Sequence, residues 1–184
     1  MAFETFPVLQ TERLLLRRIT QEDVHAVFQF RSDVEAQRYN EGAITRLEQA
    51  SELIARLEEG YQNRTMVEWG VTLKGGDETV IGLMGYANWS QQNRRAEIGY
   101  DLRRDYWGQG IASEALTTIL AFGFGVMDLN RIHACTWVEN VASVRLLERL
   151  GLRLEGVLRD EYWEADAFHD EAHYALLRRE YEAE

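Results

Sequence analysis

Two glycines separated by one residue lie between a predicted strand and a long apolar helix. Gly108 and Gly110 have no Cβ atoms, so the backbone around them can approach a ligand closely and adopt otherwise strained angles. The first amides of the following helix have no partner inside the helix, and with the helix dipole they form a site suited to a pyrophosphate. Arg103 and Arg104 precede the turn and would add positive charge. A tight turn with solvated arginines is the alternative that this stretch by itself leaves open.

Carboxylates on the preceding strand and near the C-terminus are candidates for acid–base chemistry. Alternation along residues 96–102 places Glu97 and Asp101 on the same face of that strand. A carboxylate that faces a substrate can accept a proton as a general base, and Glu97 is the first candidate. Pairing of Glu97 with a nearby arginine in a purely structural role is an equally good interpretation. Asp101, Glu161 and Glu164 are weaker candidates, because carboxylates in loops that flank strands are usually solvated.

A helix start farther along the chain supplies two more polar groups. Asn140 is a favourable N-cap for a helix over residues 140–150, and Ser143 lies on its first turn. Capping alone would explain Asn140. Gly151 is expected to end this helix.

Three other kinds of site use some of the same residue types. The glycine pattern from Gly108 to Ser113 is one substitution from a dinucleotide fingerprint, but the preceding strand ends near Leu102 and its neighbours read as antiparallel. His169 and His173 are four residues apart in a strand-like segment, where that spacing forms no helical metal-binding face, so no metal is expected. A Gly-x-Ser-x-Gly elbow is absent from the sequence, which gives hydrolase chemistry no support.

The elements that must position these groups follow from hydrophobic periodicity and turn residues. Short apolar or alternating runs predict strands at 13–19, 69–74, 79–89, 96–102, 131–138, 152–158 and 169–177. Capping signals and apolar stripes predict helices that begin near 20 and 45, and further helices over 111–127 and 140–150. Gly75-Gly76-Asp77 predicts a hairpin. The predicted fold class is α+β, an antiparallel meander followed by a strand-helix-strand-helix-strand unit.

Composition limits the class of protein. A chain of 184 residues with 46% hydrophobic residues suits one domain, spanning residues 1–184. The net charge of −11 repels nucleic acid and anionic membranes at long range and favours a cationic substrate. The sequence contains no apolar run of about 18 residues that would span a membrane. The single cysteine, Cys135, fits a reducing cytoplasm.

The glycine turn also supports a family resemblance. The segment from Trp107 to Ala112 resembles the acetyl-CoA loop of the GNAT superfamily of N-acetyltransferases, with Trp107 in place of the usual Gln or Arg. The form YWGQGIASEA, with TERLLLR at 11–17, is similar to the RimJ/RimL-like branch, which acetylates protein N-termini. The resemblance extends from about Thr11 to Leu177. It implies the GNAT fold, with a mixed, mostly antiparallel sheet of about seven strands and about four helices.

The same resemblance implies the roles of individual residues. The strand is expected to splay at Gly99, so that its backbone binds the pantetheine arm of acetyl-CoA, with Glu97 as the base. Many members use a tyrosine as the acid at the position of Leu147, and in this branch Ser143 would take that role. The residues implied to contact acetyl-CoA are Tyr100, Leu102, Arg103, Arg104, Trp107, Gly108, Gln109, Gly110, Ile111, Ala112, Ser113, Asn140 and Ser143.

The resemblance leaves the acceptor open. The acceptor amine would be a peptide N-terminus or a small molecule such as a polyamine or aminoglycoside, and a homodimer is a common assembly among relatives. A non-catalytic acyl-CoA-binding module is the alternative from another class of protein.

Overall fold

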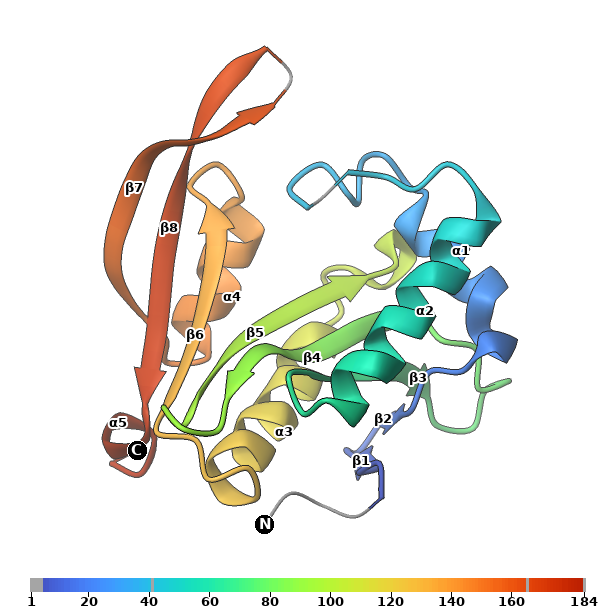
Figure 1. Ribbon diagram of the computed structural model, residues 1–184, viewed down its shortest axis with the longest axis horizontal. Helices are drawn as coiled ribbons and strands as arrows, with labels where there is room; N and C mark the ends of the chain where they lie inside the picture. The colour runs from blue at the N-terminus through green and yellow to red at the C-terminus, as the bar shows by residue number, and fades with distance from the viewer. Residues whose placement is uncertain (1–4, 41, 165, 184) are drawn as a thin grey trace.

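The computed structural model describes residues 5–40, 42–164 and 166–183. Its strands form one sheet of eight in the order β1-β2-β3-β4-β5-β6-β8-β7 (Figure 1). The strands are β1 (Leu9–Gln10), β2 (Leu14–Arg17), β3 (Val67–Leu73), β4 (Gly82–Ser90), β5 (Arg95–Leu102), β6 (Arg131–Trp137), β7 (Arg153–Glu164) and β8 (Ala167–Leu177). The α-helices are α1 (Val24–Arg31), α2 (Leu47–Gln62), α3 (Ile111–Gly125), α4 (Val141–Arg149) and α5 (Arg178–Tyr181), with short 3-10 turns at Gln21–Asp23 and Arg104–Tyr106. The predicted α+β class is confirmed, with one strand and one helix more than expected.

Helices cover both faces of the sheet, because successive strand side chains alternate between them (Figure 1). On β4, Met84 and Tyr86 belong to the core that also contains the apolar residues of α3, and the Tyr86 hydroxyl donates to the Ile119 carbonyl at 2.8 Å. Leu83 lies on the opposite face, in a second apolar cluster with α1 and α2. Leu147 of α4 joins the α3 side of the core. Within the described ranges, every helix is too short or too polar to cross a membrane.

The parallel pair β5 and β6 separates halfway along its length. Pairing between the two strands ends at Glu97 with His133. Beyond this point β5 continues to Leu102 against β4, and β6 continues to Trp137 against β8, so a gap opens between them (Figure 1). The strand was expected to splay at Gly99, and its pairing with β6 ends two residues earlier, at Glu97. The irregularity of the β4–β5 ladder lies elsewhere, between Ala87 and Ser90. The separation from β6 therefore needs no bulge at Gly99.

The strands β7 and β8 form a long hairpin that extends past the end of β6 (Figure 1). The expectation that Glu161 and Glu164 lie in a loop beside a strand is wrong, because β7 continues to Glu164. A register shift between Leu158 and Tyr162 lets β7 continue, with Asp160 at φ 55° and its N–H bonded to the Asp170 carboxylate at 2.9 Å. Ala165 lies outside the described residues.

Candidate functional site

The glycine turn has the backbone geometry that an anion site needs. Gly108 and Gly110 have φ angles of 70° and 76°, in the left-handed region where a side chain would be strained. Gly110 is the N-cap of α3, and the N–H of Glu114 donates to its carbonyl at 3.0 Å as the first helical hydrogen bond. The amides of residues 111–113 therefore lack helical partners at the positive end of the dipole.

Two segments that are distant in sequence hold this turn in place. Glu114 in the first turn of α3 accepts hydrogen bonds from the Thr11 hydroxyl and from Nε of Arg13, the latter at 2.6 Å. Nη1 of Arg13 also donates to the Gln109 carbonyl at 3.1 Å. The segments TERLLLR and GQGIASEA are thus in direct contact.

Trp107, which departs from the usual motif, anchors the turn to β5. Its indole N–H donates to the Leu102 carbonyl at 2.7 Å, and the residue is 47% exposed. The hydrogen bond spans the 3-10 turn between β5 and the first glycine. Trp107 therefore fixes the distance between the end of the strand and the turn.

A cavity of about 510 Å³ joins the glycine turn to the gap between β5 and β6. Its wall combines the end of β5, the turn, the start of α3, one face of α4 and the connector between α1 and α2. The predicted contact residues in this wall are Tyr100, Leu102, Trp107, Gly108, Gly110, Ile111, Ala112, Ser113, Asn140 and Ser143. Asp101, a weaker candidate for the base, also lies in this wall. The wall residues that the sequence interpretation missed are Glu35, Ala36, Tyr39, Asn40, Tyr106, Ala142, Arg145, Leu146 and Arg149.

Backbone groups of β5 line the gap. The N–H of Arg103 donates to the Ile81 carbonyl on the β4 side at 2.8 Å. Because alternate residues of an antiparallel strand point their backbone groups the same way, the N–H groups of Tyr100 and Leu102 point toward the gap instead. Tyr100 and Leu102 can therefore pair with an extended amide-bearing ligand, whereas the N–H of Arg103 is already used.

Both arginines that were predicted to contact the coenzyme lie outside the cavity wall. Arg103 contacts Gln29 and Asp105, and Nε of Arg104 lies 3.2 Å from the Asp33 carboxylate. Neither side chain lines the cavity, and nor does Gln109, whose amide donates to the Asp105 carbonyl. Two arginines that do line it, Arg145 and Arg149, are four apart on α4. That helical spacing places both on one face and was a usable signal in the sequence.

The predicted acid lies beside a tyrosine. The Asn140 side chain accepts the N–H of Ser143 at 3.2 Å, so Asn140 is the N-cap as predicted. The hydroxyls of Ser143 and Tyr100 are 2.6 Å apart. Burial raises the pKa of Tyr100 to about 12, with the Ser143 hydrogen bond opposing this shift. Tyr100 thus stays protonated near neutral pH and can donate to Ser143.

The predicted base lies next to the cavity rather than in its wall. The Glu97 carboxylate accepts a hydrogen bond from Nδ2 of Asn88 at 2.7 Å and lies 3.9 Å from Nε2 of His133. Burial lowers the pKa of His133, an effect that Glu97 opposes. Glu97 lies at the closed end of the gap, because it is the last residue of β5 that pairs with β6.

Asp101 organises the connector that closes the far side of the cavity. Its carboxylate accepts from Nη1 of Arg31 at 3.1 Å and from Nε2 of Gln37 at 2.8 Å. Gln37 is 1% exposed, and its side-chain carbonyl accepts from Asn40, which lines the cavity. Burial raises the pKa of Asp101, with Arg31 and Gln37 opposing the shift. Asp101 thus acts as a positioning residue for the connector.

Asp101→Asn is expected to lower the free energy of unfolding by about 1.5–3 kcal/mol, because a hydrogen bond to a charged group contributes that much. Urea unfolding followed by tryptophan fluorescence measures the change. Asp105→Asn is the matched control, since the Asp105 side chain is 71% exposed and its ion pair with Arg103 should contribute little. Equal stability of the Asp101 variant and the wild type would contradict the positioning role.

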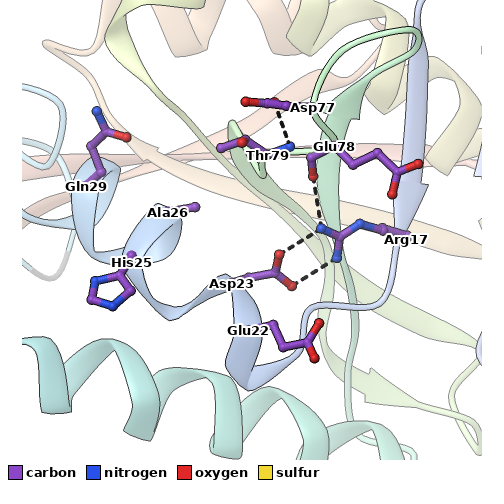
Figure 2. Close-up of a pocket in the computed structure, with 9 residues that line it drawn as sticks. All are labelled: Arg17, Glu22, Asp23, His25, Ala26, Gln29, Asp77, Glu78 and Thr79. Atoms are coloured by element: carbon purple, nitrogen blue, oxygen red, sulfur yellow. Dashed lines mark hydrogen bonds and ion pairs between the residues drawn. The ribbon is translucent and has the colours of Figure 1, made fainter.

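A second hollow of about 460 Å³ lies apart from the glycine turn, between β2, α1 and residues 77–79 (Figure 2). Arg17 crosses it, donating to the Asp23 carboxylate at 2.7 and 2.9 Å and to the Glu78 carbonyl at 3.0 Å (Figure 2). These bonds satisfy the guanidinium within the protein. The hollow is therefore a structural junction, and we assign no ligand to it.

The chain is similar in sequence to known proteins along most of its length. The family model for the acetyltransferase (GNAT) domain matches residues 13–153. The chain is 40% identical over 178 residues to the uncharacterized N-acetyltransferase p20 of Bacillus licheniformis, covering 94% of this chain and 97% of p20. It is 35% identical over 174 residues to the uncharacterized N-acetyltransferase YoaA of Bacillus subtilis (strain 168), covering 94% and 98% of the two chains.

A solved structure confirms the fold. RimL, a ribosomal L7/L12 alpha-N-protein acetyltransferase in complex with coenzyme A, superposes with a TM-score of 0.86 at 21% identity. The match covers 93% of this chain and 98% of RimL. With a family model that matches most of its length and two relatives above 30% identity, the chain belongs to the GNAT family of acetyltransferases.

Proposed function

We propose that the protein transfers an acetyl group from acetyl-CoA to a primary amine, by direct attack of the amine within a ternary complex. The observation that carries this proposal is that one continuous cavity joins the glycine turn to the gap between β5 and β6. A pyrophosphate on the amides of residues 111–113 leaves the pantetheine arm free to run along Tyr100 and Leu102. Arg145 and Arg149 add positive charge for the phosphates. The thioester then reaches the gap, where an amine can approach from the opposite side of the sheet.

Each step of the transfer has a candidate group. Glu97 accepts the proton of the attacking amine, directly or through a water. The N–H of Tyr100 donates to the thioester oxygen as negative charge develops on it. The carbon–sulfur bond then breaks, and Ser143 supplies the proton that converts the leaving thiolate to coenzyme A. The Tyr100 hydroxyl, 2.6 Å from Ser143, stabilises the serine oxygen during that transfer.

For the acceptor we propose the α-amine of a basic peptide. The net charge of −11 favours a cationic substrate, and Glu35 lines the acceptor end of the cavity. RimL, which shares this fold, is named for acetylating a protein α-amine. Polyamines and aminoglycosides are the second choice, since they share the positive charge. We further propose a cytoplasmic location, which fits the free thiol of Cys135, and a homodimer.

Release of free thiol from acetyl-CoA tests the function, with basic peptides, polyamines and aminoglycosides as acceptors. We expect turnover with at least one acceptor and the highest kcat/KM for a peptide whose N-terminus is free. An N-terminally blocked peptide that lacks lysine is the matched control and should give no turnover. Calorimetric binding of acetyl-CoA with no turnover for any amine would instead favour the non-catalytic binding module.

Glu97→Gln is expected to lower kcat roughly tenfold near neutral pH, because water still removes part of the amine protons. The loss should shrink as the pH approaches the pKa of the amine, where the amine is already deprotonated. Steady-state rates across pH, with the best acceptor of the panel, measure this effect. Glu155→Gln is the control, because Glu155 is bound to Arg131 at 2.5 and 2.7 Å at the exposed edge of the sheet. A pH-independent loss would remove Glu97 from the role of base.

A further inference from the structure

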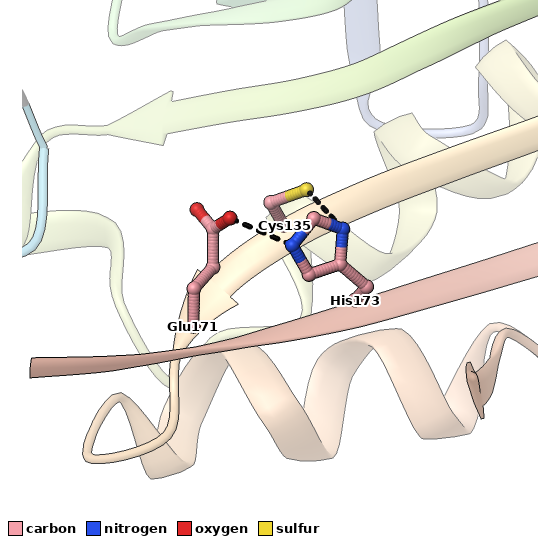
Figure 3. Close-up of side chains that lie close together, drawn as sticks. All are labelled: Cys135, Glu171 and His173. Atoms are coloured by element: carbon pink, nitrogen blue, oxygen red, sulfur yellow. Dashed lines mark hydrogen bonds and ion pairs between the residues drawn. The ribbon is translucent and has the colours of Figure 1, made fainter. Parts of the chain in front are cut away.

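Three side chains of metal-ligand type converge on the face of β6 and β8 that lies opposite α4 (Figure 3). Cys135 and His173 are directly opposed in the antiparallel ladder, and Glu171 lies two residues from His173, so all three point to the same side. Sγ of Cys135 is 3.3 Å from Nδ1 of His173, and a Glu171 oxygen is 2.8 Å from Nε2 of His173. One donor atom from each residue lies within 4.8 Å of the other two.

We propose that Cys135, His173 and Glu171 bind a divalent transition-metal ion, with Zn²⁺ as the best-fitting ion. Thiolate, imidazole and carboxylate are the ligands that zinc prefers, and tetrahedral bonds of about 2.3 Å to sulfur and about 2.0 Å to nitrogen place those two atoms about 3.5 Å apart. The sulfur and nitrogen here are already at 3.3 Å. A histidine offers one nitrogen to one ion, so Glu171 must turn from Nε2 toward the ion at Nδ1. Glutamate has the side-chain freedom for that movement.

The surroundings favour a cation at this position. Burial, and after it the nearby carboxylates of Glu171 and Glu97, raise the pKa of Cys135 to about 12, with Arg131 opposing. The two carboxylates also attract a divalent ion, whose binding releases the thiol proton to solvent. In the described structure Nε2 of His173 contacts the Glu171 carboxylate, and Nδ1 contacts the Cys135 thiol. The three side chains are therefore already drawn together without an ion.

The spacing of His169 and His173 within one strand gives no indication of this site, whose ligands come from two strands. The two strands that supply the ligands are hydrogen-bonded along their whole paired length, from Arg131 with Leu177 to Trp137 with Glu171. Such a scaffold holds ligands with little loss of entropy on binding. Three protein ligands leave a fourth position open to water, as in zinc sites that exchange ligands.

The site adjoins the gap between β5 and β6. Cys135 follows His133, the last residue of β6 that pairs with β5. An ion bound at Cys135 would stand on the side of the sheet from which the acceptor approaches. Zinc should therefore inhibit acetyl transfer. This inhibition rests on the proposed function, but the binding of the metal does not depend on it.

Cobalt titration of chelator-treated, reduced protein tests the binding site directly. We expect one Co²⁺ per chain, with a near-ultraviolet thiolate-to-cobalt charge-transfer band and visible bands of tetrahedral cobalt that Zn²⁺ abolishes. Cys135→Ser should eliminate the charge-transfer band, and His173→Gln and Glu171→Gln should each weaken binding at least tenfold. His133→Gln is the matched control, because His133 is on the same face of β6 but outside the cluster.

The proposal fails if wild-type protein gives no thiolate band, or if the three variants bind Co²⁺ like the wild type. Either result would identify a hydrogen-bonded cluster only. Near-ultraviolet circular dichroism identifies a variant that does not fold, and Glu171→Gln, which changes only the charge, then decides the question. These measurements of cobalt binding need no acceptor amine. A failure of the metal proposal can therefore be told apart from a failure of the proposed acetyltransferase function.

Discussion

Gly110→Val is expected to weaken acetyl-CoA binding on the order of 100-fold, because amide–phosphate hydrogen bonds contribute roughly 1.5–3 kcal/mol each and the change disturbs at least two. Gly110 has a φ of 76°, and a β-branched residue in that region is a strong outlier. To relieve the strain, the peptide groups on both sides of residue 110 must rotate. The amides of residues 111–113 would then no longer point together at the pyrophosphate.

Isothermal titration with acetyl-CoA measures this loss. Space alone does not explain it, because a Cβ at Gly110 would meet only Nη2 of Arg13, at 3.6 Å. Gly125→Val is the matched control, since Gly125 lies at the other end of α3 in open space and its φ is not in the left-handed region. Unchanged affinity in Gly110→Val would show that the turn does not bind the coenzyme, and the proposed function would lose its main support.

Local signals in the sequence were sufficient for the parts of the site that depend on neighbouring residues. A glycine needed for a left-handed angle, as at Gly110, and a cap such as Asn140 act within one turn of helix, so spacing alone reveals them. The ends of β5 and the start of α3 were predicted for the same reason. Alternation also placed Asp101 on the face of β5 that meets α1, where it contacts Arg31.

Contacts between distant segments had no such signal. Arg13 contacts Glu114 across 101 residues, and Asp101 contacts Gln37 across 64, so composition and periodicity could not pair them. Arg104 was assigned to the phosphates from its position before the turn, yet its nearest acid, Asp33, lies on the connector after α1. The length of β7 was also missed, because its acidic residues lie on an exposed hairpin with no apolar alternation to indicate a strand.

Ser143→Ala is expected to lower kcat by about 100-fold, at the lower end of what a positioned proton donor contributes. In this variant the thiolate that departs from the thioester lacks the proposed hydroxyl donor, Ser143. The N-cap bond uses the backbone N–H of Ser143 and the side chain of Asn140, so alanine preserves it. Binding of acetyl-CoA should therefore change less than about threefold.

Tyr100→Phe separates the two hydroxyls that lie 2.6 Å apart. If Ser143 donates the proton and Tyr100 only supports it, the phenylalanine variant should lose less activity than Ser143→Ala, and the double variant little more than Ser143→Ala alone. Single-turnover rates, with enzyme in excess over acetyl-CoA, keep product release from masking the chemical step. A wild-type rate in Ser143→Ala would remove the serine from the mechanism. A larger loss in Tyr100→Phe would assign the proton to the tyrosine, whose pKa of about 12 keeps it protonated when the thiolate forms beside it.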